Sequence, residues 1–174
     1  MVFKLYTDGA TRPINPGPSG YGAVLYVDDR ELDHRLGFLG EDVSNNQAEY
    51  LALVAGLALV KGHVSQGRLE IYTDSALVVN QVAGRWQLRA LKLVTLCYEV
   101  RSRMRGLEES GRISVTLHHI RGHQGVVGNE RADALAGTAA ESREWAYPSL
   151  ISLLKRSEHE GRQASQRLHR TGPG

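Results

Sequence analysis

Two segments of this chain, some sixty residues apart, share one pattern in which an apolar-leaning run ends in an aspartate. The first runs from Val2 to Asp8 and closes with Leu-Tyr-Thr-Asp, and the second closes at Asp74 with Ile-Tyr-Thr-Asp. Alternating side chains give the first segment the period of a β-strand. Asp-Gly is a common turn signal, so Asp8 alone has an ordinary explanation. An aspartate at the same place in both segments favours a shared role, because a lone carboxylate is poorly accommodated in a strand.

The two aspartates gain meaning if their segments are neighbouring parallel strands. The strand ends then lie roughly 5 Å apart. Two carboxylates at that distance repel each other and the pKa of one rises, unless a cation lies between them. The repeated pattern therefore points to a pair of acids, with or without a cation, at one edge of a sheet.

The rest of the chain predicts a mixed sheet. Strands are expected over Tyr21–Asp28 and Glu31–Phe38, and a hairpin at the intervening turn makes them antiparallel. Later strands are expected over Arg68–Thr73 and Arg112–Ile120. Helices link the later strands, and such crossovers deliver parallel pairs. We predict an α/β fold with a five-stranded mixed sheet, three antiparallel strands followed by parallel ones, flanked by helices on both faces.

The clearest helix is the one expected over Ser44–Lys61. Ser44 and Gln47 match a capping box, and the residues that follow are almost all apolar. Further helices are expected over Ser75–Ala83, Leu91–Arg105 and Asn129–Trp145. Ligands of such sheets gather at the carboxyl ends of the central parallel strands, where Asp8 and Asp74 both lie.

Composition narrows the setting of the chain. Its 174 residues, with 41% hydrophobic and 23% charged, fit one domain with a tail, and the net charge of +2 says little about partners. A single cysteine, Cys97, excludes an internal disulfide. No apolar run reaches the ~20 residues that span a bilayer, and the N-terminus has no signal-peptide pattern. We therefore expect a cytoplasmic protein with no membrane partner.

Two further acids belong beside the first pair. Glu49 lies in the opening turns of the first helix and Asp133 in those of the last. Glu49 has an innocent explanation, because a glutamate complements the dipole of a helix N-terminus. Taken together, however, four carboxylates with no Lys or Arg assigned to them favour Mg²⁺ or Mn²⁺ over zinc. Two such ions about 4 Å apart are what phosphoryl transfer requires, and His123 in a nearby loop is suited to proton transfer at neutral pH.

Four motifs in this order resemble type 1 ribonuclease H. They are Tyr6-Thr7-Asp8-Gly9, Asn45-Asn46-Gln47-Ala48-Glu49, Tyr72-Thr73-Asp74-Ser75, and Gly122-His123 through Asn129-Glu130-Arg131-Ala132-Asp133. The resemblance covers about residues 2–145. It implies a catalytic domain over residues 1–146, with residues 147–174 as a basic extension that forms a short helix, a flexible tail or both. For that extension, a solvated tail and a weak nucleic-acid contact both stay open.

The resemblance implies an endonuclease that hydrolyses the RNA strand of RNA–DNA hybrids and leaves 3′-OH and 5′-phosphate ends. Carried over by motif, Asp8 bridges two Mg²⁺ ions, for which Mn²⁺ substitutes. Asp133 completes the nucleophile-side ion, while Glu49 and Asp74 hold the leaving-group ion. His123 matches a mobile histidine linked to proton transfer and product departure. We expect a monomer with no obligate protein partner.

Substrate contacts are also implied by the resemblance. Asn15, Ser44, Asn45, Asn46 and Asn129 match positions that hold the nucleic acid without reading its sequence. The basic handle of many bacterial relatives looks absent, because Gly84–Leu91 runs straight into the next helix. Arg85, Trp86 and Arg89, with Lys92 beside them, then supply a smaller groove for the DNA strand. The alternative for Trp86 is a core position.

Two other functions stay open from the residues. A nuclease or integrase-like enzyme of the same fold superfamily with another substrate is one, although the positions of Glu49 and His123 argue against it. A non-catalytic hybrid-binding module is the other, although it is expected to lack at least one of the four acids. An intact acid set favours the nuclease, since a shared fold alone does not decide function.

Overall fold

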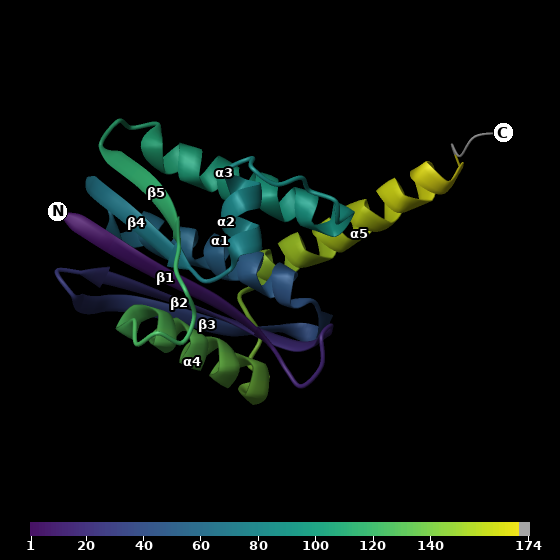
Figure 1. Cartoon of the computed structure of the whole chain (residues 1–174), viewed down its shortest axis with the longest axis horizontal. Coiled ribbons are helices and arrows are strands. Elements are labelled where there is room, and N and C mark those ends of the chain that lie inside the picture. The colour runs from purple at the N-terminus through teal and green to yellow at the C-terminus, as the bar shows by residue number, and fades with distance from the viewer. Residues whose placement is uncertain (171–174) are drawn as a thin grey trace.

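One mixed sheet organises the molecule. The computed structural model describes residues 1–170, which form a five-stranded sheet in the order β3-β2-β1-β4-β5 (Figure 1). The strands are β1 (Val2–Thr11), β2 (Gly17–Val27), β3 (Arg30–Val43), β4 (Gly67–Thr73) and β5 (Ile113–His119). β1 is central, antiparallel to β2 and parallel to β4. The predicted sheet, three antiparallel strands followed by parallel ones, is confirmed.

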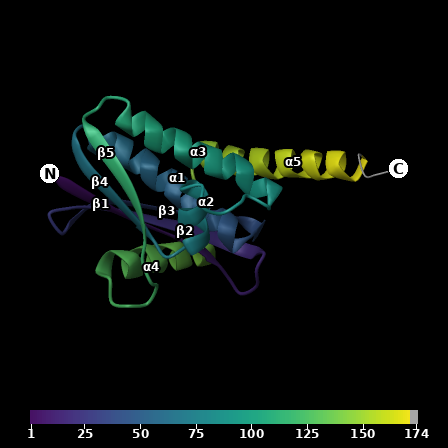
Figure 2. The ribbon, with the colours of Figure 1, turned by 45° about the horizontal axis from the view of Figure 1, so that its top comes forward.

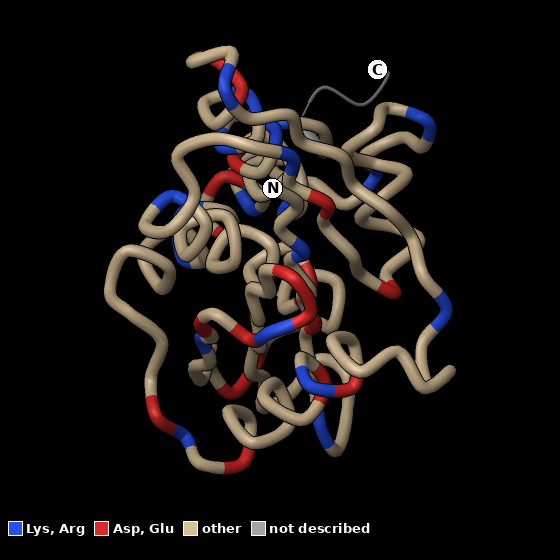
Figure 3. The backbone as a smooth tube through the Cα atoms, turned by 90° about the vertical axis from the view of Figure 1, so that its left-hand side faces the viewer, with Lys and Arg blue, Asp and Glu red and all other residues tan. Residues whose placement is uncertain are grey.

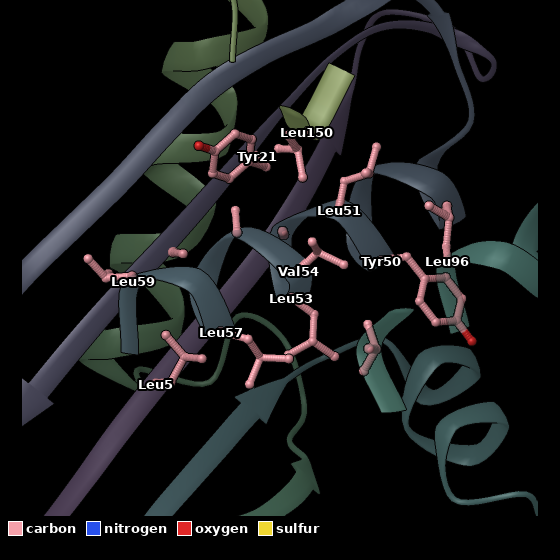
Figure 4. Packing of buried hydrophobic residues seen from close by; sticks show 14 of the residues in the cluster. Leu5, Tyr21, Tyr50, Leu51, Leu53, Val54, Leu57, Leu59, Leu96 and Leu150 are labelled. Atoms are coloured by element: carbon pink, nitrogen blue, oxygen red, sulfur yellow. The ribbon is translucent and has the colours of Figure 1, made fainter. Parts of the chain in front are cut away.

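Helices cover both faces of this sheet, as expected. α1 (Asn45–His63), α2 (Ala76–Val82) and α3 (Leu91–Glu108) lie on one face, and α4 (Val127–Ser142) lies on the other (Figure 1). α1 is buried along most of its length, and Figure 4 shows its Leu51, Leu53 and Val54 among side chains from the sheet and from α3. Each such side chain stabilises the fold by roughly 1.5–3 kcal/mol when it leaves water. The capping box predicted at Ser44 is present.

α4 packs on the opposite face through a smaller cluster. Val24 of β2 contacts Ala132 and Leu135 there. The helix comes very close to β2, because a Cβ placed on Gly22 would lie 2.2 Å from the carbonyl oxygen of Ala132. α4 ends at Ser142 rather than at Trp145 as expected, since Arg143 adopts a left-handed conformation with φ of 61°.

The C-terminal segment differs from the short helix or tail that we expected. It forms one helix of 23 residues, α5 (Pro148–Arg170), whose Leu150, Leu153 and Leu154 are buried. Its first half packs against α3, and its outer half runs past the start of α3 and away from the body of the molecule (Figure 2).

Charged residues of both signs are distributed over the fold. Figure 3 shows Lys and Arg interspersed with Asp and Glu along the chain, in keeping with the net charge of +2. Among residues 1–170, no helix has both the length and the apolar character needed to cross a membrane.

Candidate active site

The register of the sheet brings Asp8 and Asp74 together. Val2 of β1 pairs with Arg68 of β4, and the same offset of 66 residues holds through Tyr6 and Tyr72. Extended by two residues, that offset sets Asp8 beside Asp74. The pairing of β1 with β4 ends at Tyr6, whereas β1 continues to pair with β2 as far as Thr11. The two aspartates therefore lie just where the parallel strands end.

Glu49 reaches this edge because α1 passes unusually close to β1. A Cβ placed on Gly9 would lie 2.4 Å from the backbone nitrogen of Glu49, so only glycine fits there. One carboxylate oxygen from each of Asp8, Glu49 and Asp74 lies within 4.8 Å of the others. The predicted convergence of these three acids is thus present in the structure.

The electrostatics of these acids are unfavourable without a cation. Burial, followed by repulsion from Asp74 and then from Asp133, raises the pKa of Asp8 to about 7. Burial, followed by repulsion from Asp8 and Asp74, raises the pKa of Glu49 well above its ordinary value. Repulsion of this kind disappears when a divalent cation binds between the carboxylates.

The donor set fits a hard divalent cation. Glu49 Oε2 and Asn129 Oδ1 are buried and have no hydrogen-bond partner within the part of the chain that the structure describes. The Asn129 side-chain amide donates to Asp74 Oδ2 over 3.5 Å, so this buried residue contacts one of the three clustered acids. Carboxylate and amide oxygens are the ligands of Mg²⁺ and Mn²⁺, and an orphaned carboxylate oxygen is what a bound ion would satisfy.

Asp133 lies beside the three clustered acids and has a partner that we did not anticipate. The guanidinium of Arg12 lies 3.5 Å from Asp133 Oδ1. Our sequence reading assigned no Lys or Arg to the acids, and this was wrong. Arg12 follows β1 in a loop, and its guanidinium fits over α4 because Gly137 leaves space for it: a Cβ there would lie 3.3 Å from the nearest guanidinium nitrogen.

The loop that carries His123 crosses over Asp74. A Cβ placed on Gly122 would lie 2.6 Å from Asp74 Oδ2, so the backbone touches the carboxylate. His123 itself is exposed, with φ of 55°. A second histidine was missed by the sequence reading: the ring of His119 lies 3.2 Å from the backbone oxygen of Asp74. Its place in the His118-His119-Ile120 strand end was the available signal.

Beside the acids, the predicted substrate residues divide into two groups. Arg85, Trp86 and Arg89 line one cavity of about 520 Å³ together with Asn46. Trp86 is 51% exposed, so the core alternative for it is wrong. Asn80 fixes this segment, since its side-chain oxygen accepts a hydrogen bond of 2.7 Å from Arg85.

The other predicted contacts are occupied within the fold. The Ser44 hydroxyl donates to Gln47 Oε1 over 2.9 Å and accepts from the Gln47 backbone as the cap of α1. The backbone N–H of Asn45 donates to Asn15 Oδ1 over 3.0 Å, which ties the loop after β1 to the start of α1. Their part in binding a nucleic acid stays a prediction.

Comparisons with known proteins agree with this geometry. The sequence model of the RNase H family matches residues 2–141. A ribonuclease H of Thermosynechococcus vestitus is 34% identical over 142 residues, spanning 78% of this chain and 86% of that protein. The crystal structure of RNase H1 from Halobacterium salinarum superposes with a TM-score of 0.64 at 31% identity, covering 82% of this chain and 99% of that one.

A third relative was solved with a bound nucleic acid. LC11-RNase H1, in complex with an RNA/DNA hybrid, superposes with a TM-score of 0.65 at 28% identity, covering 80% of this chain and 97% of that one. The family match ends at residue 141, so α5 lies outside it.

Proposed function

The chain belongs to the ribonuclease H family, and from this premise we propose that it hydrolyses the RNA strand of RNA–DNA hybrids with two Mg²⁺ ions, bound at the edge of the sheet where the four acids lie. The observation that carries the proposal is the convergence of three acids, with one oxygen of each lying within 4.8 Å of the others. Burial and mutual repulsion keep the pKa of Asp8 near 7, so the cluster favours a divalent cation. The acid edge is defined here as Asp8, Glu49, Asp74 and Asp133.

Each acid has a place in the proposed mechanism. Asp8 interacts with the other three acids and would hold both ions. Asp133 would act on the nucleophile side, and Glu49 and Asp74 on the leaving-group side. When bound, the ions lower the pKa of the attacking water and stabilise the leaving 3′ oxygen. Asn129 would orient Asp74, since its amide already contacts that carboxylate.

The proposed reaction is the hydrolysis of a phosphodiester bond. A water oxygen bonds to phosphorus as the bond from phosphorus to the 3′ oxygen breaks, which leaves a 5′-phosphate and, after proton uptake, a 3′-OH. His123 is exposed in a loop that touches Asp74, so it would carry protons between the site and solvent. Its removal should slow turnover without abolishing it, because water can also carry protons.

The hybrid would enter beside the acid edge. We call the cavity of about 520 Å³ whose lining includes Asn46, Arg85, Trp86, Arg89 and Ala90 the first groove. Arginines there would contact phosphates of the DNA strand, and the exposed ring of Trp86 would pack on a sugar. The bound hybrid in LC11-RNase H1 supports this class of substrate. We also propose that the protein is a monomer in the cytoplasm. Its one cysteine, Cys97, is free and buried.

The experiment that tests this function is cleavage of a labelled RNA–DNA hybrid with Mg²⁺ and with chelator, beside matched double-stranded RNA and double-stranded DNA. Metal-dependent cutting confined to the RNA strand of the hybrid supports the proposal. Cutting of another duplex instead would identify a nuclease of different substrate. Tight binding of the hybrid without any cutting would identify a non-catalytic module.

A further inference from the structure

α5 lies outside the residues that match the family model, and its outer half lies next to the first groove. We propose that α5 and the start of α3 form a second, basic groove that takes the phosphate backbone of the hybrid where it continues past the acid edge. This inference rests on the proposed function, because it extends the same substrate along the surface.

The second groove is a cavity of about 800 Å³ between two elements. Arg89 and Lys92 line it at the start of α3, and Arg162 and Ser165 line it on α5. Arg89 and Ala90 also line the first groove, so the two cavities meet at these residues. A duplex lying in the first groove therefore has a continuous path into the second.

α5 is held in place by contacts along its buried side. Gly161 is buried against the start of α3, where a Cβ would lie 2.9 Å from the backbone nitrogen of Lys92. On the flank away from the second groove, the Thr95 hydroxyl donates to Glu160. On that flank Arg156 also lies 3.9 Å from Glu99. These contacts fix which residues of α5 face the second groove.

The charges of the two flanks differ in a way that favours a polyanion. Within residues 1–170, no ion pair joins Arg89, Lys92 or Arg162 to a carboxylate, and Glu158 is the one acid among the residues lining the second groove. Cations left without internal partners attract phosphates and release counterions when they bind them. The hydroxyl of Ser165 adds a neutral donor of the kind that contacts phosphates.

Reach matches a duplex rather than a small anion. The residues of α5 that line the second groove run from Glu158 to Leu168 and span about 15 Å at ~1.5 Å per residue. At ~3.4 Å per base pair, that length corresponds to about four to five base pairs. Figure 2 shows α5 running past the start of α3 and away from the rest of the molecule. The second groove is therefore expected to act only on hybrids that extend beyond the acid edge.

The test compares Arg162→Glu with Arg30→Glu. Arg30 is an exposed arginine directly after the β2–β3 turn. The end of β2 before that turn pairs with the beginning of β1, at the opposite end from Asp8. Binding is measured by fluorescence anisotropy in an Asp8→Asn background, with a hybrid that covers the acid edge alone and with one about ten base pairs longer at each end.

The longer hybrid should bind Arg162→Glu about 3- to 10-fold more weakly than the parent, and the slope of log affinity against log salt should fall by about 1. The shorter hybrid should bind both variants equally, and Arg30→Glu should match the parent on both. In the active enzyme, the change should appear in KM and not in kcat.

Several outcomes would overturn the proposal that the second groove binds the hybrid. Equal affinity and salt slope for the two variants, an equal loss on both hybrids, or an effect confined to kcat would each do so. Arg162→Gln repeats the test with a milder change, and melting curves verify that both variants fold. Failure of the proposed function is a separate result, since the unmodified chain would then fail to cut the RNA strand of either hybrid.

Discussion

The acid edge and the second groove represent opposite ways of preparing a protein for a charged ligand. At the acid edge, the sheet register and a close helix contact force like charges together in a buried place, and the pKa of Asp8 rises to about 7. In the second groove, Arg162 is exposed on α5, Arg89 is exposed just before α3, and Lys92 is half-buried in the first turn of α3. Changes at the acid edge should therefore alter chemistry and stability, whereas changes in the second groove should alter affinity alone.

The largest effect is expected from Asp8→Asn. Asp8 is the acid whose pKa is raised by both Asp74 and Asp133, so its charge is coupled to acids on both sides of the proposed metal site. We expect cleavage to fall by at least ~10³-fold while hybrid binding survives. Single-turnover cleavage and anisotropy binding on the same hybrid measure the two quantities. If binding and cleavage fell together, Asp8 would be structural, and the contrast with the second groove would fail.

Stability of the metal-free protein should depend on pH in an unusual direction. The pKa of Asp8 in the folded protein is about 7, against an ordinary value of 3.8, so the folded state holds more protons between these values. Stability contributed by this group is therefore present below about pH 4 and is lost as the pH rises through about 7. Thermal melting in chelator should show the loss.

Mg²⁺ should reverse that loss at pH 8. A ligand present at 100 times its dissociation constant stabilises the folded state by about 2.7 kcal/mol. Asp8→Asn is the internal control, because it should melt higher than the parent in chelator and respond less to Mg²⁺. A melting temperature that is unchanged by millimolar Mg²⁺ would count against a preformed site.

Glycine-to-alanine substitutions at two helical positions should have smaller effects on stability. They distinguish the packing of α5 against α3 from intrinsic helix propensity. Gly161 and Gly106 both lie inside helices, but a Cβ at Gly161 would press on the backbone of Lys92, whereas a Cβ at Gly106 would meet nothing within 4 Å. Gly106→Ala should stabilise the protein by about 0.5–1 kcal/mol. Gly161→Ala should lose that gain and destabilise by about 1 kcal/mol or more. Urea denaturation compares the two, and equal stabilisation would mean that α5 does not pack as described.

The acid edge could be predicted from the sequence better than the position of α5, because different interactions determine the two regions. The repeated strand endings predicted Asp8 beside Asp74. In a parallel pair of strands the offset between paired residues is constant, so aligning one pair also aligns the pairs that follow it. The length of α5 was missed because its buried stripe continues after Leu154 through Ser157 and Gly161, which carry no hydrophobic signal. Its outer half depends on a contact with Lys92 that no local pattern announces.

Arg12 was missed for a related reason. Its position depends on the path of the loop after β1 and on the space above Gly137, neither of which is encoded by residues near it in sequence. The acids of the four motifs could be predicted because Asp8, Glu49 and Asp133 lie on regular elements and Asp74 directly follows one. A cation that reaches them from a loop could not.

Arg12 combines features of the two regions, because it is an exposed cation that lies at the acid edge. Its substitution should have the smallest effect. Within the described chain it is the cation that pairs with an acid of the acid edge, at 3.5 Å from Asp133. Because 55% of its side chain is exposed, solvent screens much of its charge. Arg12→Gln should lower the Mg²⁺ concentration for half-maximal cleavage by about two- to fivefold, since it removes a competing positive charge. Arg30→Gln controls for net charge, and a higher Mg²⁺ requirement in Arg12→Gln would instead show that Arg12 holds Asp133 in place for the ion.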